Sequence, residues 1–150
     1  MTTRKKIVII SIVMIVIGAG VGVYFMRDAL FGGAPSKTSL PSSVDKNLNL
    51  KDITAVATAA NTLSDSGAGP DKVQQVYDAA IESSTEPAVE AQYYIFKSSA
   101  YINEKQYDQA FEAASKAESL SPSKSTAAEL AEVYVLKNDK PNAIKYFKLA

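Results

Sequence analysis

Residues 101–122, YINEKQYDQAFEAASKAESLSP, decide the fold class because they contain the end of one helix, a turn and a complete second helix. Small and apolar residues recur here every three or four positions, which is the period of an amphipathic helix, and Pro122 ends the second helix. Part of the pattern returns 33 residues later, where Tyr134, Ala143, Phe147 and Ala150 correspond to Tyr101, Ala110, Ala114 and Ala117. Such a period, with two helices in each repeat, is typical of an array of helical hairpins.

The same helical period extends from Leu48 to the end of the sequence. Clusters of proline, glycine and serine divide the segment, since these residues open or end helices. We predict six helices, at about 50–64, 71–83, 88–104, 107–120, from Ser123 or Ser125 to 137, and from a turn at 138–141 to Ala150. No convincing strand pattern interrupts them, so residues 48–150 are predicted to form an all-α domain. A helical bundle without repeats is the alternative.

The unit at about 91–124 resembles the tetratricopeptide repeat family, which places aromatic and small residues at fixed positions of a helical pair. The positions that carry the resemblance hold Tyr94, Ser98, Tyr101, Tyr107, Ala110, Ala114, Ala117 and Pro122. The next unit, 125–150, keeps much of this pattern but has Ala127 in place of a large residue and Lys140 in place of an aromatic one. A weaker unit precedes both. The resemblance implies a short α-solenoid of about three units, which together cover about 100 residues.

Members of this family usually bind an extended peptide or a helix on the concave surface formed by the first helix of each unit. The resemblance therefore implies a partner-binding groove lined by Gln92, Ile95, Ser99, Ile102, Asn103, Glu132 and Val135, with Ser125, Ala128 and Leu136 at further positions. This surface is apolar with a few amides, which suits a hydrophobic segment or a partner helix. One branch of the family holds a C-terminal carboxylate with lysine and asparagine, but Ile95 and Ser99 occupy those positions here. The alternative is that the apolar members are core residues, with the assumed register wrong by one position.

Residues 7–26, IVIISIVMIVIGAGVGVYFM, carry no charge and are long enough to span a bilayer as a helix. Three basic residues at positions 4–6 precede them, and such residues stay in the cytoplasm. We predict a cytoplasmic N-terminus at 1–6, a single-pass signal anchor in the cell membrane at 7–26, a flexible linker at 27–47, and an extracytoplasmic helical domain at 48–150. A cleaved secretory signal, which would give a secreted adaptor, is the alternative, although cleavage after Ala34 would leave proline at the new terminus.

Two features of the sequence predict self-association. Gly18 and Gly22 lie four residues apart in the predicted anchor, a spacing that lets two membrane helices approach closely. On the last helix, Ile144 and Phe147 belong to an apolar surface that we expect to be partly uncovered and to contact another protein or a second copy. A structural membrane oligomer with an empty groove is therefore an alternative function.

The composition narrows the chemistry that the chain can perform. It has no cysteine and no histidine, which excludes thiolate nucleophiles, histidine-based acid–base catalysis and the common zinc ligand sets. A basic patch with interleaved aromatics is also missing, so nucleic acid is not an expected partner. We expect no enzyme activity, no metal and no cofactor. The layout resembles membrane-anchored tetratricopeptide proteins of bacterial envelopes, so the expected function is a tethered scaffold or adaptor for another protein in envelope assembly or secretion.

Overall fold

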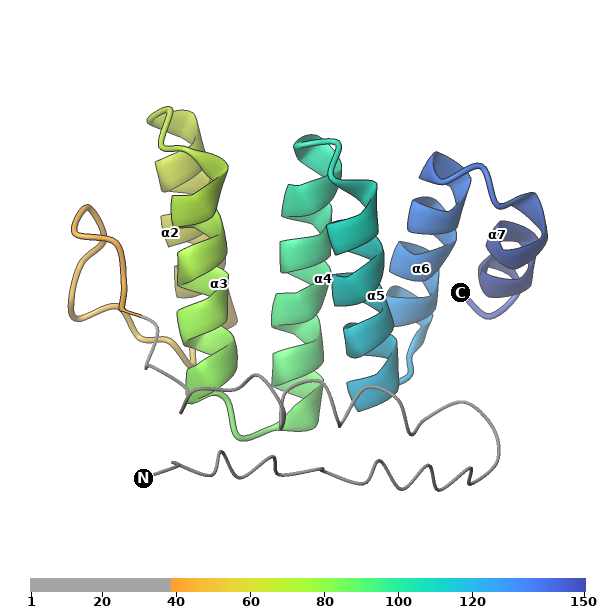
Figure 1. The fold of residues 1–150 in the computed structure, drawn as a ribbon. Coiled ribbons are helices and arrows are strands. Elements are labelled where there is room, and N and C mark those ends of the chain that lie inside the picture. Colours follow the sequence, from red (N-terminus) through yellow and green to blue (C-terminus); the bar gives the residue numbers. More distant parts are fainter. Residues whose placement is uncertain (1–38) are drawn as a thin grey trace, which may run out of the picture. The chain divides into compact units, whose positions relative to one another are not determined.

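The computed structural model of the chain describes residues 39–150, which contain six α-helices and no strand (Figure 1). The helices are α2 (Ile53–Asp65), α3 (Pro70–Ser83), α4 (Pro87–Asn103), α5 (Tyr107–Leu120), α6 (Lys124–Leu136) and α7 (Lys140–Phe147). The all-α prediction is therefore confirmed for this part of the chain. The predicted anchor with Gly18 and Gly22 lies outside the described residues. None of the helices within 39–150 is both long and apolar enough to cross a membrane.

Local side-chain chemistry sets where these helices begin. The first predicted helix begins at Ile53 rather than near residue 50, because the Asp52 carboxylate accepts hydrogen bonds from the backbone N–H groups of Thr54 and Ala55, at 2.9 and 3.1 Å. Pro70 and Pro87 occupy the first turns of α3 and α4, where proline costs no hydrogen bond. The last helix ends at Phe147 rather than at Ala150, and Lys148 and Leu149 form a turn after it.

The helices α2, α4 and α6, each the first of a helical pair with the helix that follows it, end in the same type of turn. Gly67, Lys105 and Asn138 all have positive φ angles, of 74°, 59° and 59°. In each case the next backbone N–H donates to a carbonyl five residues earlier: Ala68 to Leu63 at 3.0 Å, Gln106 to Tyr101 at 2.9 Å, and Asp139 to Tyr134 at 2.8 Å. This is the bonding of a left-handed helix cap. The two helices within each of the three successive pairs are thus joined by the same type of turn. Glycine occupies the position of positive φ only in the first turn.

Replacing Lys105 by glycine is expected to stabilise the protein by about 1 kcal/mol, because a side chain at positive φ is strained and glycine is not. Alanine at the same position keeps a Cβ atom and should give no such gain. Urea unfolding of the full chain, followed by circular dichroism, compares Lys105→Gly with Lys105→Ala. Equal stability of the two variants would contradict the left-handed conformation at this turn.

Each helix packs against the next helix in the chain. In addition, α2 contacts α4, and α4 contacts α6. The first core joins α2, α3 and the start of α4, and its buried members include Val56, Val76 and Tyr93. The second core joins α5 and α6 through Ala110, Ala114, Leu130 and Val133, with partly buried aromatic side chains from α4 to α7 around them. The alanines matter because small side chains allow α5 to lie close to its neighbours.

The segment before α2 belongs to the helical domain. Leu40, Val44, Leu48 and Leu50 all pack against the first core, and Val44 is buried. The Tyr93 hydroxyl also donates a 2.8 Å hydrogen bond to the carbonyl oxygen of Leu50. The prediction of a flexible linker as far as Asn47 is therefore wrong for its last residues, because these apolar side chains bury enough surface together to order the chain.

Candidate functional site

A groove of about 210 Å³ lies between α2 and α4, with α3 as its floor. Each helix contributes residues three or four positions apart, which form one face of that helix. Its polar lining comes from Asn61 and Ser64 on α2, Gln74 and Tyr77 on α3, and Ser99 and Asn103 on α4. The rings of Tyr77 and Phe96, 6.2 Å apart, hold α4 against α3 at the base. We call this site the α2–α4 groove.

The α2–α4 groove is lined mainly by uncharged side chains. Its walls carry amide and hydroxyl groups between alanines, and Glu104 is the charged member of the lining. Such a surface offers hydrogen bonds together with apolar contacts, which is the usual composition of a binding site. Within residues 39–150, no group of three or more acidic side chains lies close enough together to hold a metal ion.

Gln74 is the unusual member of this lining. Its residue is only 8% exposed, yet neither its side-chain nitrogen nor its side-chain oxygen has a hydrogen-bond partner within the described part of the chain. An unpartnered buried polar group costs about 1–3 kcal/mol. Within residues 39–150 the amide therefore has no hydrogen bond that offsets its burial.

The predicted groove residues of α4 divide into three groups. Ser99 and Asn103 line the α2–α4 groove, as expected for a binding surface. Ile102 instead packs against the second core, so for this residue the alternative of a misplaced register is correct. Gln92 and Ile95 are half-buried on α4 but do not line the groove. The helix presents Phe96, Ser99, Ala100 and Asn103 to the groove, a face that the assumed register captures only in part.

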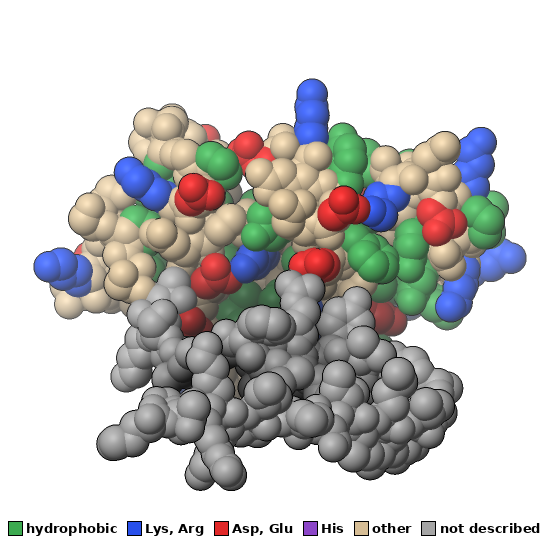
Figure 2. All heavy atoms as spheres, viewed as in Figure 1, with side chains coloured by type: hydrophobic (Ala, Val, Ile, Leu, Met, Phe, Trp, Pro, Cys, Tyr) green, Lys and Arg blue, Asp and Glu red, His purple; other side chains and the backbone are tan. Residues whose placement is uncertain are grey.

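The predicted residues of the last helical pair lie outside the α2–α4 groove. Glu132 and Val135 of α6 are exposed, and neither lines it. Ile144 and Phe147 of α7 are 57% and 56% exposed, which confirms that this surface is uncovered in the described structure. Figure 2 shows apolar side chains among lysines at the end of the domain that carries α7. Self-association through this surface stays a prediction.

Sequence reasoning missed the contribution of α2 and α3, including Asn61 and Gln74. The resemblance assigned binding positions only to the later units, where its motif is clearer. One signal for Gln74 was present, because it falls within the apolar face of α3 that Val73, Val76 and Tyr77 define. A polar residue on a buried helix face needs a partner, and that need marks it for attention.

Comparison with known proteins assigns no family to this site. No protein-family model matches the chain, and no curated protein matches it. Function is therefore inferred from the groove's own residues.

A side-chain hydrogen bond connects the α2–α4 groove to α6, the first helix of the last pair. Ser99 of α4 donates to the Glu129 carboxylate of α6, with oxygen–oxygen distances of 3.2 and 3.4 Å. Burial raises the pKa of Glu129, hydrogen bonding from Ser98 and Ser99 opposes that rise, and the nearby charge of Glu132 adds to it. The carboxyl thus binds its proton more tightly in the folded protein than in the unfolded chain.

Because the folded-state pKa of Glu129 is raised, this residue favours folding most at low pH. Its contribution is lost as the pH rises from its unfolded value, about 4.3, through the folded pKa. Glu129→Gln keeps an oxygen for Ser99 without a charge, so the variant should melt a few degrees higher at pH 7 and equal the wild type at acid pH. Thermal unfolding at several pH values, with the exposed Glu112→Gln as a control, checks this. A lower melting temperature at pH 7 would contradict it.

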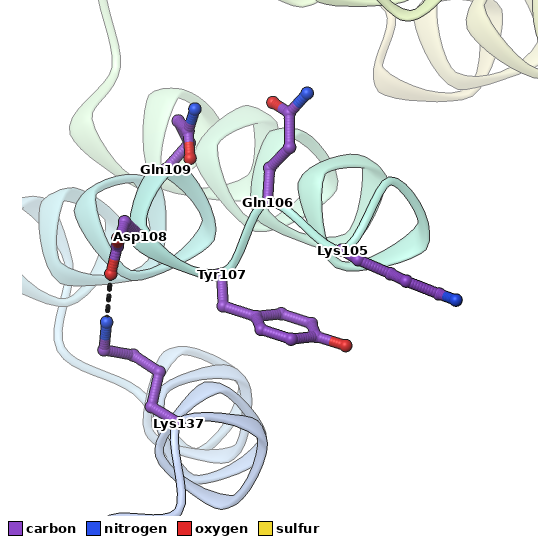
Figure 3. Close-up of a pocket in the computed structure, with 6 residues that line it drawn as sticks. All are labelled: Lys105, Gln106, Tyr107, Asp108, Gln109 and Lys137. Atoms are coloured by element: carbon purple, nitrogen blue, oxygen red, sulfur yellow. Dashed lines mark hydrogen bonds and ion pairs between the residues drawn. The ribbon is translucent and has the colours of Figure 1, made fainter.

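Another hollow, of about 390 Å³, lies beside the α4–α5 turn and is lined by Lys105, Gln106, Tyr107, Asp108, Gln109 and Lys137. Figure 3 shows most of these side chains pointing away from one another into solvent, while Lys137 forms an ion pair with Asp108. Although this hollow is larger than the α2–α4 groove, its polar groups do not converge. We therefore place the candidate site in the groove.

Proposed function

We propose that residues 48–150 form a short solenoid of three tetratricopeptide-like pairs, α2–α3, α4–α5 and α6–α7, which binds a segment of another protein. The observation that carries the proposal is the α2–α4 groove, because the first helices of two successive pairs form its walls and line it with amide and hydroxyl side chains. The bound segment would be an extended peptide or a helix. Binding, rather than catalysis, is the proposed activity.

Two structural regularities support the repeat architecture. The left-handed turns at Lys105 and Asn138 lie 33 residues apart, as do the carbonyls of Tyr101 and Tyr134 that accept their hydrogen bonds. Contacts between α2 and α4 and between α4 and α6 place the first helices of neighbouring pairs next to each other. Both features are expected when similar hairpins stack in one direction.

The proposed role is that of a tethered scaffold or adaptor in envelope assembly or secretion. The proposal includes a single-pass anchor at residues 7–26, with a cytoplasmic N-terminus and the helical domain outside the cytoplasm. The anchor and its orientation are inferred from the uncharged run at 7–26 and from the three basic residues that precede it. Protease added to intact spheroplasts should cleave the helical domain and leave the anchor in the membrane. A protected domain would contradict this orientation, and release of an uncut domain would favour the secreted alternative.

Site-specific photo-crosslinking tests the binding function in native membranes. A photoreactive amino acid at Asn61 or Asn103, on opposite walls of the groove, should capture the same protein, since one ligand would touch both. The same probe at the exposed Lys116 of α5 should not capture it. Failure at both wall positions, or equal capture at all three, would contradict binding in the groove.

A second candidate function is self-association, which the exposure of Ile144 and Phe147 favours. In this alternative, the apolar surface of α7 contacts a second copy of the chain. A photoreactive probe at Phe147 should then yield a homodimer, and Ile144→Ser should abolish it. If the full chain stays monomeric in membranes at every expression level, this candidate is excluded.

A further inference from the structure

We propose that the last helix docks on an anionic lipid surface, where its apolar side chains enter the bilayer interface and its lysines contact lipid phosphates. The docking surface, which we call the α7 face, consists of Lys140, Ile144, Phe147 and Lys148. These residues lie at positions i, i+4, i+7 and i+8, so they share one side of the helix. All four are exposed, whereas Ala143 is buried and Tyr146 packs against the second core.

Exposed large apolar side chains gather at the end of the domain that carries α7. Those found among residues 39–150 are Val135, Leu136, Ile144, Phe147 and Leu149, from the end of α6 to the turn after α7. Within the described chain α7 contacts α6 and no other helix. The first helical pair differs, because the segment before α2 packs against its core. The α7 face is therefore the helix side on which the domain leaves large apolar groups in water.

Charge separates the same end from the rest of the domain. Residues 39–134 carry seven basic and fourteen acidic side chains, whereas residues 135–150 carry four basic side chains and one acidic. The acidic one, Asp139, already caps α7, because its carboxylate accepts hydrogen bonds from the backbone and side-chain N–H groups of Asn142, at 3.3 and 2.7 Å. An acidic domain thus ends in a surface that is both basic and apolar.

Three lysines at this end have their ammonium groups free for an anionic partner. Lys137 forms an ion pair with Asp108, but within the described residues Lys140, Lys145 and Lys148 form none. Figure 2 shows lysine side chains beside apolar ones at this end of the domain. The long stem of lysine lets neighbouring apolar groups enter a bilayer interface while its charge stays at the level of the phosphates.

A lipid surface fits these features better than a second copy of the chain or another folded protein. Contact between two α7 faces would bring the same lysines together, and like charges repel across an interface. Neither of the two hollows described above is lined by a residue of α7, so neither provides a recess that would select a partner by shape. A bilayer interface offers anionic groups above an apolar interior and requires no matching shape.

The docking depends on a tether, since a helix of eight residues buries too little surface to hold the domain on a membrane by itself. It therefore rests on the anchor that we propose at residues 7–26, which would keep the domain near the bilayer and raise its effective concentration there. It does not depend on binding in the α2–α4 groove.

A fluorophore beside the α7 face tests the docking in the full chain, reconstituted in vesicles of phosphatidylcholine and phosphatidylglycerol. The chain has no cysteine, so Leu149→Cys provides a unique labelling site. Quenching by nitroxide-labelled lipid should show this label in contact with the bilayer. In vesicles of phosphatidylcholine alone, or in high salt, it should stay in water, because the lysines lose their anionic partners or are screened. A label at Lys116→Cys on α5 should stay in water throughout.

Variants of the labelled chain separate the contributions of charge and apolar burial. Removing three lysines should lower the ratio of docked to undocked label about a hundredfold, since each contributes about fivefold near an anionic surface. This variant carries Lys140→Gln, Lys145→Gln and Lys148→Gln. A matched control, which should change the ratio little, removes exposed lysines elsewhere through Lys72→Gln, Lys116→Gln and Lys124→Gln. Phe147→Ser should lower the ratio about tenfold, because it removes the largest apolar group of the face.

The outcomes distinguish this proposal from the anchor on which it rests. If the chain floats with anionic vesicles in high salt but the label at residue 149 stays in water at low salt, the anchor stands and the docking is overturned. Lipid contact that persists in neutral vesicles or without the three lysines would also overturn it. A label shielded from water only at high protein density, and not quenched by lipid, would assign the α7 face to a second copy instead. A chain that does not float refutes both the anchor and the docking.

Discussion

Replacing Tyr93 by alanine is expected to destabilise the protein by about 3–5 kcal/mol, which is typical for truncation of a buried aromatic residue. Tyr93 is the largest fully buried side chain among residues 39–150, and its ring lies in the first core. Its hydroxyl also donates a hydrogen bond to the carbonyl of Leu50, so the substitution would also remove one of the contacts that hold the segment preceding α2. Urea unfolding of the full chain, followed by circular dichroism, measures the loss.

Tyr93→Phe separates the two contributions at this position. It keeps the ring and removes only the hydrogen bond to Leu50, so the loss should be about 1 kcal/mol. Should Tyr93→Ala cost no more than Tyr93→Phe, the ring would not be packed in the core as described. Equal stability of Tyr93→Phe and the wild type would instead mean that the bond to Leu50 contributes nothing in solution.

Leu130→Ala is expected to cost about 2–5 kcal/mol, because it opens a cavity in the second core, where Leu130 is 2% exposed. Leu136→Ala on the same helix makes a matched control, since Leu136 is 37% exposed and should lose much less. The same unfolding measurement compares the two variants. Similar losses from both would contradict the assigned orientation of α6.

Most helix boundaries could be predicted because they depend on residues at the boundary itself. Features that depend on contacts between distant parts of the chain were missed. Proline and glycine mark the turns before α3 and α4, and those helices were placed nearly as found. The start of α2 was missed because Asp52 was not recognised as a cap. The segment containing Val44 was interpreted as a linker since its composition is that of one, and only its place in the first core shows that it is packed.

The candidate groove was predictable only in part for a similar reason. Ser99 and Asn103 were found because the resemblance assigns a face of α4, but Ile102 lies next to that face and turns into the second core. The floor at Gln74 could not be placed from the sequence, since it depends on how α3 packs against both α2 and α4. Helical periodicity predicts which side of a helix is buried, but not which buried residue is left without a partner.

The position of α4 between the α2–α4 groove and the last helical pair has a consequence for the proposed binding function. Within the described structure α2 and α6 share no contact, so the groove and the last helical pair communicate through α4. Ser99 belongs to both regions, because it lines the groove and donates to Glu129. A ligand that draws the Ser99 hydroxyl away would leave the Glu129 carboxylate without that donor and favour its protonated form. Under the proposed binding function, occupancy of the groove and proton uptake at Glu129 would therefore be thermodynamically linked, and each would change the free energy of the other by the same amount.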